Sequence, residues 1–145
     1  MRFLIILLFS TMIYSQNIVP HQWKSRVIVI SGTAENSDKV EKQFKDFQTK
    51  KEALLERKLV IYKCFKSTCT YYDWISEPKE IQLKTKSENF EIKLYGLDGG
   101  DKFLSEKPIT SKQIFDLIDS MPMRQSEIRT KNKKDENMHR TFKRD

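Results

Sequence analysis

The chain has 145 residues, a formal net charge of +7, 38% hydrophobic residues and 32% charged residues. This length suits one domain with a modest core. A basic chain can bind nucleic acid, but lysine and glutamate are interleaved along most of this sequence, which is typical of a solvated surface. We therefore expect no nucleic-acid partner. Beyond the N-terminal residues, no apolar run is long enough to cross a membrane.

Residues 1–15 have the pattern of a secretory signal peptide. Arg2 precedes an apolar run over residues 3–9, and the small residue Ser15 stands near the end. The apolar run is too short to span a bilayer. We expect cleavage before Gln16, so that the membrane is met only through the signal peptide; an uncleaved anchor is the alternative. The predicted location is secreted or periplasmic.

The next segment predicts a β-α-β unit. A β-branched run over residues 26–31, bounded by Gly32, is typical of a buried parallel strand. Residues 59–65 form a second such run. Between them, residues 37–58 predict an amphipathic helix, and its apolar face holds Val40, Phe44, Phe47, Leu54 and Leu55. The order implies a right-handed crossover, with Trp23 packed over the sheet edge.

A hairpin is predicted further along. Apolar and polar residues alternate over 90–94, which indicates a half-buried strand. Asp98, Gly99 and Gly100 then supply a tight turn, because glycine adopts positive φ without a Cβ clash. Residues 102–104 form the return strand. Turn chemistry is the simplest role for Asp98, since neither a calcium loop nor a phosphate loop has this pattern.

A capped helix follows the hairpin. Thr110 is a good N-cap, and Gln113 three positions later completes a capping box. Pro122 ends the helix, because the residue before a proline is displaced from the α region. The buried face of this helix is predicted to hold Ile114, Phe115, Leu117, Ile118 and Met121.

Three segments carry a resemblance to a known family. They are Trp23-x-x-Arg26, then Gly96-Leu97-Asp98-Gly99-Gly100-Asp101-Lys102, and Phe115-x-x-Ile118-Asp119-x-Met121-Pro122-Met123-Arg124. Over about residues 23–129, the chain resembles an uncharacterised domain-of-unknown-function family of secreted, thioredoxin-like and peroxiredoxin-like domains. Such domains occur as bacterial single-domain proteins and in animal extracellular proteins of the sushi-repeat and DRO/URB type. The resemblance implies fold and export, but no agreed activity.

The predicted fold class is α/β. The order β-α-β then β-β-α indicates a thioredoxin-like three-layer fold around a mixed four-stranded sheet, over residues 23–124. Residues 16–22 are a short linker. Residues 125–145 are mostly charged, which predicts a fraying helix or a disordered, solvated tail; its basic excess could also touch an anionic cell envelope.

The usual redox equipment of such a fold is missing. Thioredoxins place Cys-x-x-Cys after the first strand, at a helix N-terminus, but residues 31–36 contain no cysteine, and residues 87–89 lack the expected proline. The two cysteines are Cys64 and Cys69. In an oxidising compartment they would pair as a local disulfide. An exchange-active or metal-binding pair and two free thiols are the alternatives.

Residues 66–89 give the weakest pattern. We expect a short helix or an irregular loop there, with residues 81–83 as a candidate strand. Tyr71, Tyr72 and Trp74 either cover the sheet or form an exposed recognition patch.

The segment Met121, Pro122, Met123 and Arg124 also has two interpretations. It can be a helix end whose methionines fill the edge of the core, or an exposed patch for a partner.

Other chemistry has little support in the sequence. His21 and His139 lie at opposite ends outside the predicted core, which argues against a Ser-His-Asp site. Zinc-ligand spacing is absent, and no cofactor is predicted. We therefore expect a binding or envelope-associated module with an unknown protein or cell-envelope partner. The alternative is a weak thiol–disulfide oxidoreductase that uses Cys64 and Cys69.

Overall fold

The computed structural model describes residues 19–83, 85 and 88–143. The predicted signal peptide and residues 16–18 of the predicted linker lie outside the described residues. In the described part, no helix combines the length and the apolar character needed to cross a membrane.

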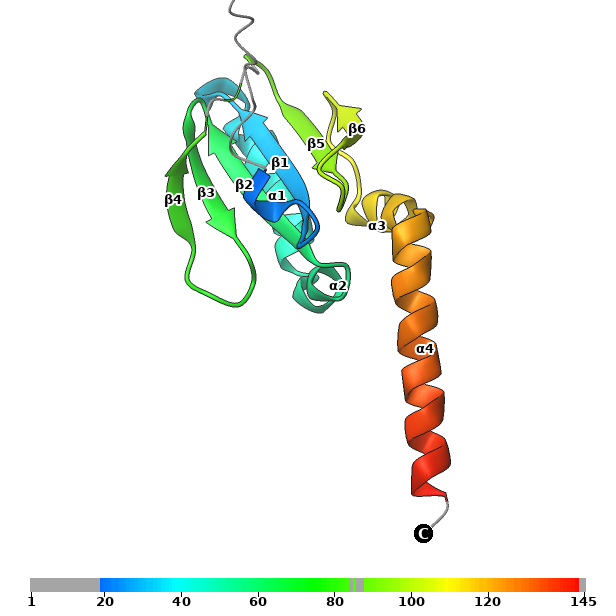
Figure 1. Cartoon of the computed structure of the whole chain (residues 1–145). Coiled ribbons are helices and arrows are strands. Elements are labelled where there is room, and N and C mark those ends of the chain that lie inside the picture. The colour runs from blue at the N-terminus through cyan, green and yellow to red at the C-terminus, as the bar shows by residue number, and fades with distance from the viewer. Residues whose placement is uncertain (1–18, 84, 86–87, 144–145) are drawn as a thin grey trace, which may run out of the picture.

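The described residues form a mixed α/β structure (Figure 1). Its strands are β1 Arg26–Gly32, β2 Leu59–Phe65, β3 Thr68–Tyr72, β4 Lys79–Gln82, β5 Glu91–Tyr95 and β6 Asp101–Ser105. Its α-helices are α1 Ser37–Gln48, α2 Lys51–Glu56, α3 Ser111–Asp119 and α4 Pro122–Phe142, and two short 3-10 helices cover Val19–His21 and Ala34–Asn36.

The sheet has six strands in the order β4-β3-β2-β1-β5-β6, not the four that the sequence predicted. β1 and β2 are parallel, and every other neighbouring pair is antiparallel. The two additional strands come from the segment that was expected to be a loop or short helix. The first of them, β3, was missed because the tight turn that joins it to β2 uses Lys66 at φ 55°, where glycine or asparagine is the usual signal.

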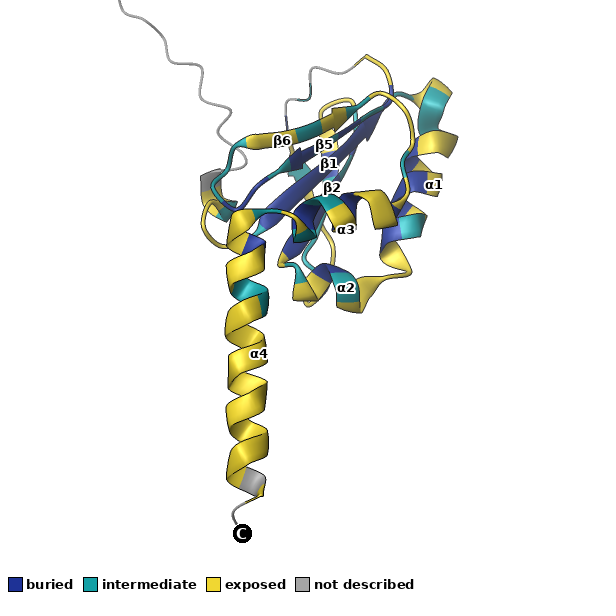
Figure 2. Ribbon diagram, turned by 90° about the vertical axis from the view of Figure 1, so that its right-hand side faces the viewer, coloured by how far each residue is buried: buried dark blue, intermediate teal, exposed yellow. Residues whose placement is uncertain are grey.

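The helices α1, α2 and α3 lie on the same side of the sheet (Figure 2). Their apolar side chains join Ile28 and Ile30 of β1 in one buried cluster. Val27 and Val29 belong to a second cluster on the other face, to which these helices contribute no side chain. The described residues therefore form two layers, the sheet and the helices on one of its faces, where the sequence predicted three. The chain between β2 and β5, which would have to supply the third layer, forms β3 and β4 at the sheet edge instead.

The predicted helix over residues 37–58 is two helices. α1 ends at Gln48, and α2 begins at Lys51 after a break in which Lys50 leaves the helical region (φ −120°, ψ 40°). Because one helical period does not run across the break, Leu54 is buried while Leu55 is 39% exposed. The prediction of a buried Leu55 was wrong.

The C-terminal helices meet at a sharp junction. The capping box predicted at the start of α3 is present, since the Gln113 backbone N–H donates to Thr110 Oγ1 at 3.3 Å and the Thr110 N–H donates to Gln113 Oε1 at 3.0 Å. α3 ends at Asp119, and Pro122 is the first residue of α4, a position that suits proline. α4 projects from the body of the domain (Figure 1), and its residues 129–141 are exposed.

Candidate functional site at the junction of α3 and α4

The β5–β6 turn forms one wall of the candidate site. Gly99 has φ +80°, which favours glycine, and the Gly96 N–H donates to the Gly100 carbonyl at 2.9 Å. Asp98 accepts from the Gly100 N–H at 3.1 Å and from Lys102 Nζ at 2.8 Å. These two hydrogen bonds, that from Lys102 first, lower the pKa of Asp98. The turn is therefore a fixed platform.

Trp23 lies against the backbone of this turn. Its N–H donates to the Leu97 carbonyl at 2.6 Å, while Gln22 Nε2 donates to the Asp98 carbonyl at 3.0 Å. Trp23 has φ 64° and is 62% exposed. The expectation that it packs over the sheet edge was wrong. An exposed indole on a backbone that non-glycine residues rarely adopt makes Trp23 a candidate for a functional role.

The α3–α4 junction forms the opposite wall. Met121 is the N-cap of α4 and gives it no side-chain hydrogen bond. The N–H groups of Met123 and Arg124 find no acceptor in the described part of the chain. Met123 is 40% exposed, whereas Arg124 is only 4% exposed. Each interpretation of this segment therefore holds for part of it. Met123 is exposed and accessible to a partner, whereas Arg124 is buried and structural.

Arg124 fastens the junction to the rest of the domain. Its Nε donates to Asp119 Oδ1 at 3.0 Å, its Nη1 donates to the Glu56 carbonyl at 3.1 Å, and its Nη2 lies 3.1 Å from Glu56 Oε1. Burial alone would lower the pKa of Arg124, but hydrogen bonds to Asp119 and Glu56 raise it. This side chain is an anchor and not an exposed recognition group.

Arg26 forms the base of the site and is 1% exposed. Its Nη1 donates to the Arg57 carbonyl at 2.9 Å and lies 3.3 Å from Glu127 Oε2 of α4. Its Nε has no hydrogen-bond acceptor among the described residues, and the same holds for Arg57 Nε. A buried donor without an acceptor is costly, so an acceptor brought by a ligand would be favourable here.

Arg57 completes this arrangement through Asp119, whose Oδ2 lies 2.5 Å from Arg57 Nη2. Burial alone would raise the pKa of Asp119, but hydrogen bonds from Arg57 and Arg124 lower it below its ordinary value. We refer to these side chains together as the arginine network: Arg26, Arg57, Arg124, Glu56, Asp119 and Glu127.

A hollow of about 320 Å³ borders the arginine network at Arg26. Its lining residues are Arg26, Gly96, Leu97, Asp98, Lys102, Met121, Pro122 and Met123. All three segments that carry the family resemblance thus meet at one place, although they are far apart in sequence. The volume is at the lower end of ligand sites, and the lining is mainly apolar with a few charged groups.

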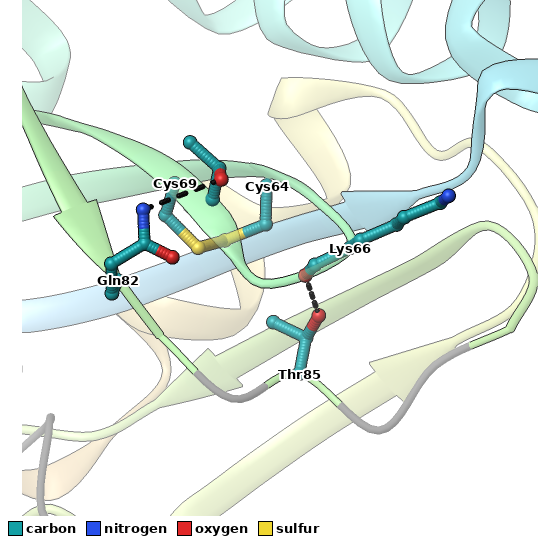
Figure 3. Close-up of a disulfide and its surroundings, with 6 residues drawn as sticks. Cys64, Lys66, Cys69, Gln82 and Thr85 are labelled. Atoms are coloured by element: carbon teal, nitrogen blue, oxygen red, sulfur yellow. Dashed lines mark hydrogen bonds between the residues drawn. A yellow bond between two sulfur atoms is a disulfide. The ribbon is translucent and has the colours of Figure 1, made fainter.

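The two cysteines lie elsewhere and are paired. Cys64 and Cys69 face each other in the β2–β3 register and form a disulfide (Figure 3). Both are fully buried, and the described residues hold no free cysteine. The prediction of a local disulfide is confirmed, and the alternative of two free thiols was wrong. Neither sulfur lies at a helix N-terminus, where a thiolate is stabilised.

The aromatic residues of the β3 region pack on both faces of the sheet. Trp74 is 9% exposed and donates from Nε1 to the Leu59 carbonyl at 2.9 Å on the helical side. On the other side, His21 stacks on Tyr71 and its Nε2 lies 2.6 Å from the Tyr62 hydroxyl. Of the two interpretations, cover of the sheet therefore fits better than an exposed recognition patch, because Trp74 is buried and Tyr71 and Tyr72 are half-buried. The placement of His21 was not foreseen, because nothing in the sequence links it to residues 41 positions away.

Metal binding finds no support in the described residues, where no three histidine, cysteine or carboxylate side chains are grouped as ligands.

Comparison with known proteins identifies the family of the chain. The family described as Domain of unknown function (DUF4174) matches residues 18–127, which agrees with the expected uncharacterised family. Neither a curated protein nor a solved structure gives a significant match.

Proposed function

This chain belongs to the DUF4174 family of domains of unknown function, and we propose that it is an exported binding module on a thioredoxin-like scaffold. Its partner is a protein, in solution or in the cell envelope. The observation that carries the proposal is the hollow at the α3–α4 junction, where the three segments of the resemblance converge beside the exposed Trp23.

The strand order supports the thioredoxin-like part of this proposal. The parallel pair β1–β2 is connected through α1 and α2, and the antiparallel hairpin β5–β6 next to β1 leads into α3. With β3 and β4 left aside, this is the order β-α-β then β-β-α that the sequence predicted. β3 and β4 are then an addition at the β2 edge.

The disulfide supports export. Disulfides form and persist mainly in oxidising compartments, and Cys64 and Cys69 are joined in a fully buried position. Together with the signal-like pattern of residues 1–15, this favours a secreted or periplasmic protein.

The surface around the hollow supports binding. Tryptophan, methionine and arginine are enriched at protein interfaces, and tryptophan is a frequent source of binding energy. Met123 is exposed on one wall of an apolar hollow, and the exposed Trp23 donates its backbone N–H to the Leu97 carbonyl of the other wall. Their ion-paired surroundings keep both walls in place, which lowers the entropic cost of binding.

The alternative of a thiol–disulfide oxidoreductase has less support. Exchange requires an accessible sulfur and a stabilised thiolate, whereas Cys64 and Cys69 are both fully buried. A disulfide-reductase assay that compares Cys64→Ser with the parent separates the two functions. We expect no turnover from either; a turnover that Cys64→Ser abolishes would favour the enzyme.

A photo-crosslinking experiment tests the binding module directly. A photoreactive amino acid is placed at Met123 and, as a control, at Ile75, which is 85% exposed and lies outside the hollow. In cells that produce the protein, we expect a discrete adduct from Met123 that Trp23→Ala removes, and none from Ile75. Equal adducts from both positions, or none, would contradict the proposed function.

A further inference from the structure

The N-terminus of α4 has electrostatics that favour a negatively charged ligand. A helix N-terminus carries about half a positive charge, and its first N–H groups need acceptors. In this 21-residue helix the N-cap Met121 supplies no side-chain oxygen, and the N–H groups of Met123 and Arg124 have no acceptor in the described residues. Anions bind at such positions.

A second observation points to the same ligand. Arg26 lines the hollow, is 1% exposed, and has an Nε that no described residue accepts from. Lys102 lines the wall of the hollow that the β5–β6 turn forms, and its ion pair with Asp98 holds it there. Positive charge and unsatisfied donors therefore come from three separate elements: the start of β1, β6 and the start of α4.

The remaining lining is apolar and adaptable. Leu97, Met121 and Met123 present aliphatic and thioether groups, and methionine adjusts to the shape of its neighbours. With a volume of about 320 Å³, the hollow suits a group of the size of one amino-acid side chain. A carboxylate next to one apolar side chain is the chemistry of a polypeptide C-terminus.

We propose that the hollow binds the C-terminal residue of a partner polypeptide. The apolar side chain lies against Leu97, Met121 and Met123, and the terminal carboxylate accepts from the free N–H groups of α4 and from Lys102. Capture of a C-terminal carboxylate by backbone N–H groups is an established recognition mode. The exposed Trp23 favours a polypeptide over a free small acid, because only a longer chain would also cover its ring. This inference rests on the proposed function.

Asp98 opposes the carboxylate and provides a sensitive test. Its own carboxylate lines the hollow and is ion-paired with Lys102. Asp98→Asn removes that negative charge and leaves Lys102 free for the ligand, so the variant should bind more tightly than the parent. Lys102→Gln should bind more weakly by about fivefold.

The binding experiment uses three short peptides and NMR titration of the purified protein. The probes are acetyl-Gly-Gly-Leu with a free carboxylate, the same peptide as its C-terminal amide, and acetyl-Gly-Gly-Ser with a free carboxylate. We expect the first to shift signals of Gly96, Leu97 and Met123, with at least about tenfold weaker binding of the other two. Equal binding of acid and amide would overturn the proposal.

Two variants make the test specific. Lys112→Gln is the control for Lys102→Gln, because Lys112 also forms an i,i+4 ion pair with an aspartate but lies outside the hollow; it should bind like the parent. Met121→Ser introduces a capping oxygen that would occupy the free N–H groups itself, so we expect the affinity to fall at least about tenfold.

The outcomes separate this inference from the proposed function. An adduct from Met123 in cells, without any preference for the peptide acid, would leave a binding module and remove the C-terminal specificity. Binding of 4-methylpentanoate without binding of the peptide acid would assign the hollow to a free small acid and overturn the polypeptide assignment. Absence of binding by all probes would also overturn it.

Discussion

The two ends of the parallel pair β1–β2 carry different buried chemistry. At the carboxyl ends, Ser31 is paired in register with Cys64, which is closed by its disulfide to Cys69. At the amino ends, Arg26 is paired with Leu59 and lies beside the hollow. In α/β sheets, ligands usually bind outside the carboxyl ends of the strands. Here the hollow is at the opposite end.

The difference is one of satisfied and unsatisfied groups. At the carboxyl end of β1, the first backbone N–H of the following connection, from Thr33, is accepted by Asn36 Oδ1 at 2.8 Å. At the amino end, Arg26 Nε and Arg57 Nε lack acceptors among the described residues. Buried polar groups are normally paired. Because Arg26 lines the hollow, its unpaired Nε indicates that a ligand is expected at the amino end. The buried disulfide at the carboxyl end argues against a redox site there.

The largest effect should come from breaking the arginine network. Arg124→Met leaves Asp119 and Glu56 without their buried partner, so we expect the free energy of unfolding to fall by about 3 kcal/mol. Urea denaturation measures it. The control Arg129→Met, on the exposed part of α4, should change stability by less than about 0.5 kcal/mol. Equal losses would show that the amino end is not held by these ion pairs.

Removing the disulfide at the carboxyl ends of β1 and β2 should lower the free energy of unfolding by a smaller amount. The double variant Cys64→Ala and Cys69→Ala removes a cross-link between residues five positions apart, and such a short loop gives about 2 kcal/mol. We expect this loss in urea denaturation, with peptide binding at the hollow unchanged. A change in binding would mean that the two ends are coupled, which would contradict their separation.

Much of the amino end could be predicted from local sequence. Gly99 at positive φ and the Thr110–Gln113 capping box have short-range causes, and both are present. The meeting of Arg26 with Glu127 could not be predicted, because it joins residues 101 positions apart through tertiary packing. The hollow exists only as a result of that packing.

The errors in the predicted sheet have a similar origin. β4 has the sequence KEIQ, with one β-branched residue, so its local propensity is weak. β3 has the sequence TCTYY, which favours a strand, and it was missed because the turn at Lys66 that joins it to β2 lacks glycine. Pairing of β3 with β2 satisfies backbone groups and buries Cys69, and β4 in turn pairs with β3. Tertiary context thus overrides the weak local propensity of β4.

A pH titration sharpens the role of the network. The pKa of Asp119 is lowered in the folded protein, so its contribution is present above the unfolded pKa, near 3.8, and is lost as pH falls through the folded pKa. Asp119→Asn should therefore be less stable than the parent by about 1 kcal/mol at pH 7, with the gap closing below pH 4 in thermal unfolding. Asp116→Asn, from an exposed ion pair with Lys112, should show a smaller gap.

The smallest stability effect should accompany a large functional one. Trp23 and Lys66 both have positive φ, at 64° and 55°, and only Trp23 lies beside the hollow. Glycine adopts this conformation without strain, so Trp23→Gly and Lys66→Gly should each change the free energy of unfolding by no more than about 0.5 kcal/mol. Trp23→Gly should nevertheless abolish the Met123 adduct, and Lys66→Gly should keep it. If Trp23→Gly destabilised the fold strongly and kept the adduct, the exposed indole of Trp23 would have a structural role. That result would contradict the proposed binding role of the amino end.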